Sequence, residues 1–129
     1  WRSLPTGPLL SVYLPTAAWS GTELFIWAGG RGASYDPASD RWTVLPDGYA
    51  NPRSEAVWTG REIVVFGDSI AQTYDPQTRT WHGQSSVPPG ITSARVAHRM
   101  VWTGTEVVVF GGRTGLDYLA DGAAWRRSP

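Results

Sequence analysis

The sequence predicts an all-β protein built from three consecutive repeats of a four-stranded antiparallel unit. Three observations predict this fold class: a short hairpin motif occurs three times, a Tyr and a Trp follow every copy at fixed distances, and no segment has the apolar period of an α-helix. Short runs of β-branched and aromatic residues alternate instead with clusters of Gly, Pro, Asp and Ser, as expected for strands and turns.

The hairpin motif reads Trp, then Ser or Thr, then Gly, any residue, and Glu. An apolar run follows each Glu, a Tyr stands twelve residues after the Glu, and a Trp stands seven residues after the Tyr in all three copies. The recurring residues are Glu23, Glu62, Glu106, Tyr35, Tyr74, Tyr118, Trp42, Trp81 and Trp125. Chance does not preserve two spacings through three copies. Each copy is therefore interpreted as one structural unit, with the recurring Tyr and Trp as core residues between units.

Each unit is expected to contain four strands joined by tight turns. The first two strands of the second copy are joined through Gly60, because a tight hairpin needs a residue that tolerates positive φ. The last two are joined by an Asp-Pro turn, in which the Asp75 carboxylate accepts backbone N–H groups. The second strand is apolar without alternation, so both of its faces should be covered. The four strands are predicted at Glu55–Thr59, Glu62–Phe66, Gln72–Tyr74 and Thr80–Gly83.

The repeat spacing divides the chain into three units and a leading segment. The units are predicted at residues 6–46, 47–86 and 87–129. Residues 1–5 are the last strand of a preceding unit or a leader, because Trp1-Arg-Ser-Leu-Pro5 matches Trp42-Thr-Val-Leu-Pro46. The third unit lacks the Asp-Pro turn after its Tyr, so we expect it to be looser than the other two.

Composition excludes several classes of function. The formal net charge is zero, which gives no broad electrostatic case for binding nucleic acid or an anionic membrane. The absence of Cys excludes disulfides, thiolate metal sites and Cys nucleophiles. The two His residues have no carboxylate cluster nearby, and no nucleophile elbow, phosphate loop or dinucleotide fingerprint is present. We therefore expect no enzyme activity, no cofactor, no metal, no nucleic-acid partner and no membrane insertion.

The repeat resembles the kelch motif. A hydrophobic strand ending in a Gly pair, a Tyr-Asp-Pro step, and a Trp seven residues after the Tyr are similar to kelch repeats, and the Trp-Thr-Gly-x-Glu hairpin is similar to bacterial kelch and galactose-oxidase-like propellers. The resemblance covers nearly the whole chain. It departs from the motif at Ala28-Gly29, at Gly67-Asp68 and after Tyr118. The copper chemistry of galactose oxidase needs a Cys–Tyr crosslink and does not carry over to a chain without Cys.

The resemblance implies four-stranded blades arranged radially around a channel. Propellers commonly contain about four to eight blades, so three blades cannot close a ring, and two apolar end faces would be exposed. The expected partner is a second copy, giving a homodimer with about six blades. With three full blades, the strand at Trp1–Pro5 is one too many for closure by strand exchange. Either this segment is only a leader, or it displaces the weak last strand near Trp125. The alternative is a piece of a larger secreted kelch or galactose-oxidase-like enzyme or glycan-binding protein whose catalytic residues lie elsewhere.

A binding surface is expected where the variable loops emerge. In an antiparallel blade, the loop between the second and third strands and the connection to the next blade emerge on one face, and function concentrates on such loops. This face would bind a protein or a glycan. The resemblance favours a secreted or extracytoplasmic location, while the sequence itself leaves the compartment open. The alternative is that these loop residues are ordinary solvated positions, and that two of the arginines only brace the entry to the next blade. The candidate residues are Arg31, Tyr49, Arg53, Asp68, Arg95, Arg113 and Asp117.

Overall fold

The computed structural model describes residues 1–9, 12–48, 53–85 and 94–127, and within them every regular element is a β-strand. The all-β prediction is therefore confirmed for this part of the chain. No helix in these ranges is long and apolar enough to cross a membrane. The first sheet has the antiparallel strand order β1-β2-β3-β4. Its strands are β1 (Thr16–Trp19), β2 (Leu24–Ala28), β3 (Arg31–Asp36) and β4 (Arg41–Leu45).

The second sheet repeats the arrangement of the first. It has the antiparallel order β5-β6-β7-β8, with one irregularity between Ala71 and Thr73 where β7 pairs with β8. Each strand overlaps the segment predicted for it from the repeat. The strands are β5 (Glu55–Trp58), β6 (Ile63–Gly67), β7 (Ile70–Asp75) and β8 (Thr80–Ser85).

The third sheet differs from the other two, and the prediction of four strands is wrong for it within the described residues. It contains three strands in the order β9-β10-β13, and β11 and β12 pair with each other in a separate two-stranded hairpin. The strands of the third unit are β9 (Arg99–Trp102), β10 (Val107–Phe110), β11 (Arg113–Thr114), β12 (Asp117–Tyr118) and β13 (Gly122–Trp125).

The register shows how the third unit departs from the repeat. Leu24 faces Tyr35 and Ile63 faces Tyr74 across the second and third strands, whereas the residue opposite Val107 is Trp125. Trp125 thus occupies the structural position of the recurring Tyr. Tyr118, which the spacing placed there, is 87% exposed on β12.

The missing Asp-Pro turn is the physical reason for this departure. In the first two units the Asp carboxylate holds the turn, because Asp36 accepts the N–H of Ala38 at 2.9 Å and Asp75 accepts that of Gln77 at 2.8 Å. The third unit has no such Asp after Tyr118. Residues 113–118 instead fold back on themselves at Gly115, which has a φ of 58°.

The recurring hairpin motif is held by its hydroxyl residue. The Thr59 hydroxyl accepts the backbone N–H of Glu62 at 3.2 Å, while the Thr59 N–H donates to the Glu62 carbonyl at 3.0 Å. Ser20 and Thr103 make the same pair of bonds in the other two units. The predicted positive φ at Gly60 is confirmed at 89°. The motif therefore encodes a turn in which the side chain at its second position replaces a backbone partner.

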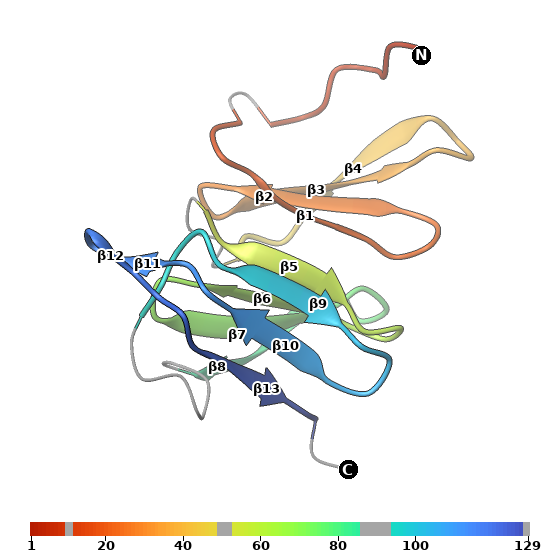
Figure 1. Ribbon diagram of the computed structural model, residues 1–129. Helices are drawn as coiled ribbons and strands as arrows, with labels where there is room; N and C mark the ends of the chain where they lie inside the picture. Colours follow the sequence, from red (N-terminus) through yellow and green to blue (C-terminus); the bar gives the residue numbers. More distant parts are fainter. Residues whose placement is uncertain (10–11, 49–52, 86–93, 128–129) are drawn as a thin grey trace.

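The first strands of the three sheets lie side by side. The closest backbone contacts between different sheets join β1 to β5 and β5 to β9 (Figure 1). The Thr16 hydroxyl donates to the Ser54 carbonyl at 2.9 Å, and Arg99 forms an ion pair with Glu55 at 2.8 Å. We call the side of each sheet that faces the preceding sheet its leading face, and the side that faces the next sheet its trailing face.

Two apolar clusters fill the gaps between the sheets. The first lies between the first and second sheets, where Trp27 packs against Tyr74 and Trp81 with ring centroids 5.4 and 5.1 Å apart. The second lies between the second and third sheets and includes Phe66 and Val109. Every residue of β6 is buried, because this strand contributes to both clusters. The prediction that the second strand is covered on both faces is confirmed for the second sheet.

Trp125, and not Tyr118, lies at the core position that Tyr74 has in the second unit. The two tyrosines should therefore contribute differently to the free energy of unfolding. Replacing Tyr74 by Ala should lower the free energy of unfolding by about 3 kcal/mol, because its buried ring leaves a cavity between Trp27 and Trp81. Tyr118→Ala should change it by less than about 0.5 kcal/mol, because that ring is exposed. Urea unfolding followed by tryptophan fluorescence measures both. Equal losses at the two positions would contradict this register.

Candidate binding surface

Backbone bridges join the loops on one side of the second and third sheets. Asp68, which follows β6, exchanges two hydrogen bonds of 2.8 Å with Arg95, which leads into β9. Val96 exchanges two more with Arg113 on β11, at 3.1 and 2.9 Å. The Ala97 N–H also donates to the Arg53 carbonyl. Four of the candidate residues are therefore brought together through their main chains.

Arg95 lies inside this network. Its side chain is fully buried, forms an ion pair with the Asp121 carboxylate at 2.8 Å, and donates to the carbonyls of Gly111 and Asp121 at 3.0 and 3.1 Å. These contacts fasten the end of β10 to the residue that precedes β13. A guanidinium buried in this way holds backbone groups in place and has no exposed donor for a ligand.

The other described candidates lie on the surface. Arg31 begins β3, Arg53 precedes β5, Asp68 follows β6 and Asp117 lies on β12, and all four are exposed, while Arg113 is half-buried. Asp68 has a φ of 56° at a position where the first and third units have Gly29 and Gly112. Asp tolerates this left-handed conformation better than most residues. Tyr49 lies outside the described part of the chain, as do residues 86–93.

His98 is buried at the inner end of the same network. Its ring packs on Phe66 with the centroids 4.8 Å apart. Burial lowers the pKa of His98 to about 4; the backbone of Phe66 opposes this change, while the positive charges of Arg95 and Arg99 add to it. His98 is therefore neutral at neutral pH and contributes to the core between the second and third sheets.

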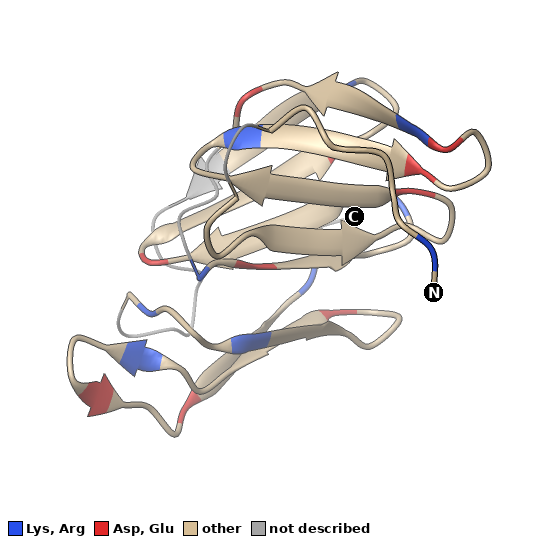
Figure 2. Ribbon diagram, turned by 90° about the horizontal axis from the view of Figure 1, so that it is seen from above, with Lys and Arg blue, Asp and Glu red and all other residues tan. Residues whose placement is uncertain are grey.

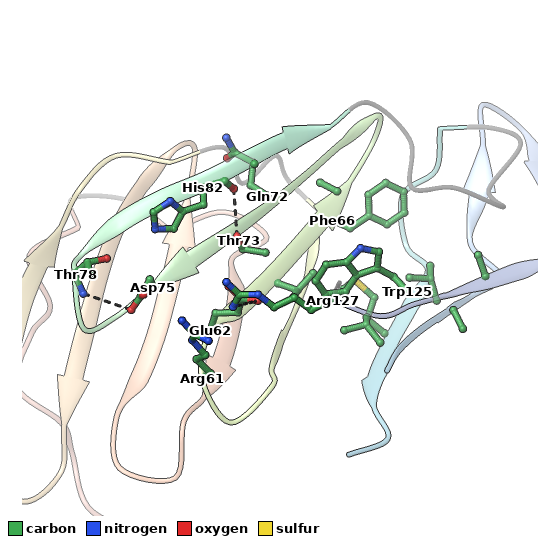
Figure 3. A pocket seen from close by; sticks show the side chains of 18 residues that line it. Arg61, Glu62, Phe66, Gln72, Thr73, Asp75, Thr78, His82, Trp125 and Arg127 are labelled. Carbon is green, nitrogen blue, oxygen red and sulfur yellow. Dashed lines mark hydrogen bonds and ion pairs between the residues drawn. The ribbon is translucent and has the colours of Figure 1, made fainter. Parts of the chain in front are cut away.

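A groove of about 670 Å³ lies between the second and third sheets (Figure 3). Phe66 and Trp125 flank its apolar part, and Thr73 and His82 line its outer part on the second sheet. At its end, the buried Glu62 carboxylate forms an ion pair with the exposed Arg127 at 3.0 Å. The repeat spacing does not predict this groove. The missing Asp-Pro turn was the signal that could have indicated it.

The groove exists because no described residue of the third unit takes the place that Trp81 has in the second. Between the first and second sheets, the outer strand β8 carries Trp81, which packs on Trp27 and on Tyr74. The equivalent positions around the groove are held by Phe66 and Trp125. The third sheet has no strand outside β13 among the described residues, so the place of Trp81 is empty there.

Positively and negatively charged residues are both spread over the described part of the chain. Arg, Asp and Glu alternate along the turns and strand ends (Figure 2). No three His, Asp or Glu side chains in the described ranges lie close enough together to hold a metal ion. His82 is exposed on β8, where its ring contacts the Thr80 hydroxyl at 2.9 Å. The arrangement offers loop side chains on a braced backbone and one apolar groove.

The comparisons with known proteins concern the fold. No protein-family model matches the sequence, and no curated protein matches it. Among solved structures, the chain is similar to one described as "Structure of YjhT", with a TM-score of 0.70 and 22% sequence identity. The similarity covers 84% of this chain and 36% of that chain. The chain therefore spans little more than a third of the length of that structure, and the likeness is one of fold alone.

The buried imidazole predicts a pH dependence of stability. The free energy of unfolding should fall by about 3 kcal/mol as the pH decreases from 6.5 to 4, because the unfolded chain binds a proton at His98 in this range and the folded protein does not. Well above pH 6.5 the residue is neutral in both states, and its contribution is complete. Urea unfolding at a series of pH values measures the dependence.

Matched substitutions of the two histidines isolate this effect from that of the carboxylates. His98→Leu should flatten the pH dependence, whereas His82→Gln should keep it, because His82 is exposed in the folded protein. A His98→Leu variant that retains the full dependence would assign it to another group.

Proposed function

We propose that the chain is a three-blade section of a kelch-type β-propeller that works by binding and not by catalysis, and that its first partner is a second copy of itself. In this interpretation the three sheets are the blades. Three observations support it. The first strands of the three sheets lie side by side, the first two sheets have the same strand order, and aromatic residues pack between sheets.

The exposure of equivalent aromatic residues carries the proposal. Trp27, Phe66 and Phe110 occupy the same position on the trailing faces of the three sheets, and their exposed fractions are 0%, 1% and 57%. On the leading faces, Trp58 packs into the first cluster, whereas its equivalent Trp19 is 51% exposed. The inner part of the leading face of the first sheet, around Trp19, and the trailing face of the third sheet, around Phe110, are therefore open, and both carry apolar residues.

One of these open faces is a leading face and the other is a trailing face, which are the two types that pack together inside the molecule. Each inner gap joins a trailing face to a leading face, so the exposed trailing face around Phe110 fits the exposed leading face around Trp19 on another copy. Two copies joined in this way at both ends form a closed ring of about six blades with two-fold symmetry. Closure removes both apolar faces from water, which is the driving force for association.

The braced loops supply the surface for a further partner. Arg31, Arg53, Asp68 and Asp117 are exposed on this side, and Arg113 is half-buried. Charged side chains on a backbone held by bridges between the sheets suit the recognition of a protein or a glycan, because little order is lost on binding. This surface is the proposed ligand site.

The alternative proposal is a section of a longer protein in which further blades of the same chain cover the open faces. The share of the YjhT structure that this chain spans, 36%, is the observation that favours it. In that case the blades would support a secreted enzyme or a glycan-binding protein, with catalytic residues outside these 129 residues.

Self-association predicts a defined mass in solution. Native mass spectrometry and light scattering of the 129-residue chain should give a dimer of about twice its 14.1 kDa mass. Phe110→Arg should convert the dimer to a folded monomer, because the side chain is exposed in one copy and would introduce a charge into the joined faces.

A control separates this effect from a general loss of apolar surface. Leu116→Arg replaces another exposed apolar residue, at the turn between β11 and β12, and should leave the dimer intact. A wild-type monomer at high concentration would reject self-association and favour the longer-protein alternative.

The loop surface makes a separate prediction. On an array of defined glycans, the assembled protein should bind a restricted set, and Arg31→Ala combined with Asp117→Ala should reduce that binding about tenfold or more without changing the mass of the assembly. Arg41→Ala, at the start of β4 on the Asp-Pro turn side, is the matched control and should bind normally. Equal binding by all three proteins would remove these loops from the site.

A further inference from the structure

We infer that residues 1–5 of one copy form the fourth strand of the third sheet of another copy, with the Trp1 side chain in the groove between the second and third sheets. This inference rests on the proposed self-association, and the pairing of residues 1–5 with β13 would stabilise the dimer. It follows from the strand count, from the position of residues 1–7, and from the shape of the groove.

The strand count supports the exchange. The third sheet contains β9, β10 and β13, and the described residues supply no strand on the outer side of β13. With the four strands that the repeat spacing predicts for the third unit, the leading segment is one strand too many for an exchange. With three strands there, the leading segment is the fourth strand that completes it.

The leading segment lies against the first sheet as the end of β4 lies against the second. The Trp42 indole donates to the Pro5 carbonyl at 2.8 Å, and the Trp81 indole donates to the Pro46 carbonyl at 3.4 Å. Both indoles also pack over a glycine, Gly7 in the first case and Gly48 in the second. Residues 1–7 therefore repeat the geometry of residues 42–48 without a sheet of their own.

The two sides of the leading segment are in different environments. Arg2 points to the first sheet, where it forms an ion pair with Asp40 at 3.0 Å and donates to the Tyr35 hydroxyl at 2.9 Å. Trp1 is fully exposed. Alternate residues of a strand point to opposite faces, so Trp1 has the orientation of a leading-face residue that lacks a preceding sheet to pack on.

Comparison with the first two sheets indicates that the groove can hold the indole of Trp1. Trp42 packs on Tyr35 and Trp81 packs on Tyr74, with ring centroids 5.1 and 5.2 Å apart. Trp1 matches these two tryptophans in sequence, and Trp125 occupies the position of the two tyrosines. An indole on a strand outside β13 would therefore meet Trp125, and across the groove it would meet Phe66.

The partner strand comes from another copy and not from the same chain. The N-terminus and β13 lie at opposite ends of the molecule (Figure 1). In the proposed ring, the leading face of one copy covers the trailing face of the other, which brings residues 1–5 beside β13. The strand and the face then belong to one continuous interface.

The register of this pairing follows from the first sheet. There Tyr35 faces Trp42 and Ala33 faces Val44. By the same register, Trp125 would face Trp1 of the other copy and Ala123 would face Ser3. Residues directly opposite each other on antiparallel strands have Cα atoms about 4.5–5.5 Å apart, which is within the range that a disulfide can span.

A designed disulfide tests the register. The chain contains no Cys, so the double variant Ser3→Cys with Ala123→Cys should form a disulfide-linked dimer under mild oxidation, seen by non-reducing gel electrophoresis and mass spectrometry. Ser3→Cys with Ala124→Cys is the matched control, because adjacent residues of β13 point to opposite faces. It and each single Cys variant should remain unlinked. An intrachain disulfide, no disulfide, or equal linkage in the controls would overturn the inference.

A second measurement separates this inference from the proposed function. Trp1→Ala should weaken the dimer by about tenfold or more, because a buried indole at an interface is typical of the residues that dominate binding, whereas Trp1→Phe should weaken it less. A wild-type dimer that Trp1→Ala leaves unchanged would overturn the strand exchange and keep the self-association. A wild-type monomer would overturn both.

Discussion

The contact of an outer-strand aromatic residue with the sheet before it is the interaction on which the rest of the structure depends. The backbones of neighbouring sheets are closest at their first strands. Only large side chains bridge the wider gap at the outer strands, and Trp81 does this by packing on Trp27 and Tyr74. Where such a residue is missing, the gap remains as a groove. The same constraint thus explains both the solid core of one junction and the cavity of the next.

The repeat spacing predicted the two complete sheets well, because their turns are encoded locally. The hydroxyl of Thr59, the left-handed Gly60 and the Asp75 carboxylate each determine a turn with residues adjacent in sequence. The spacing failed at Tyr118, although the Tyr and the Trp stand at the expected distances. Spacing identifies a unit, but the turn chemistry decides which residue reaches which strand. The groove could not be predicted, because it depends on that misassigned strand.

The side-chain environments of the candidate loop residues could not be predicted from the sequence. The loops that were expected to emerge together are joined by backbone bridges, as between Asp68 and Arg95. The sequence could not distinguish an exposed arginine from a buried one, because the difference depends on Asp121, a residue 26 positions away. His98 posed a similar problem. Its neutral state results from burial against Phe66, which belongs to a different unit.

The contacts between the first strands have a consequence for how similar units keep their order. The first junction is bridged by the hydroxyl of Thr16 on a carbonyl, and the second by the ion pair of Glu55 with Arg99. Arg99 is largely exposed, so this pair contributes little to stability. The ion pair contributes to specificity instead, because the sheets of a repetitive chain can pack in the wrong order during folding. Because the side chains that join the first and second sheets differ from those that join the second and third, packing of the sheets in sequence order is favoured over packing in another order.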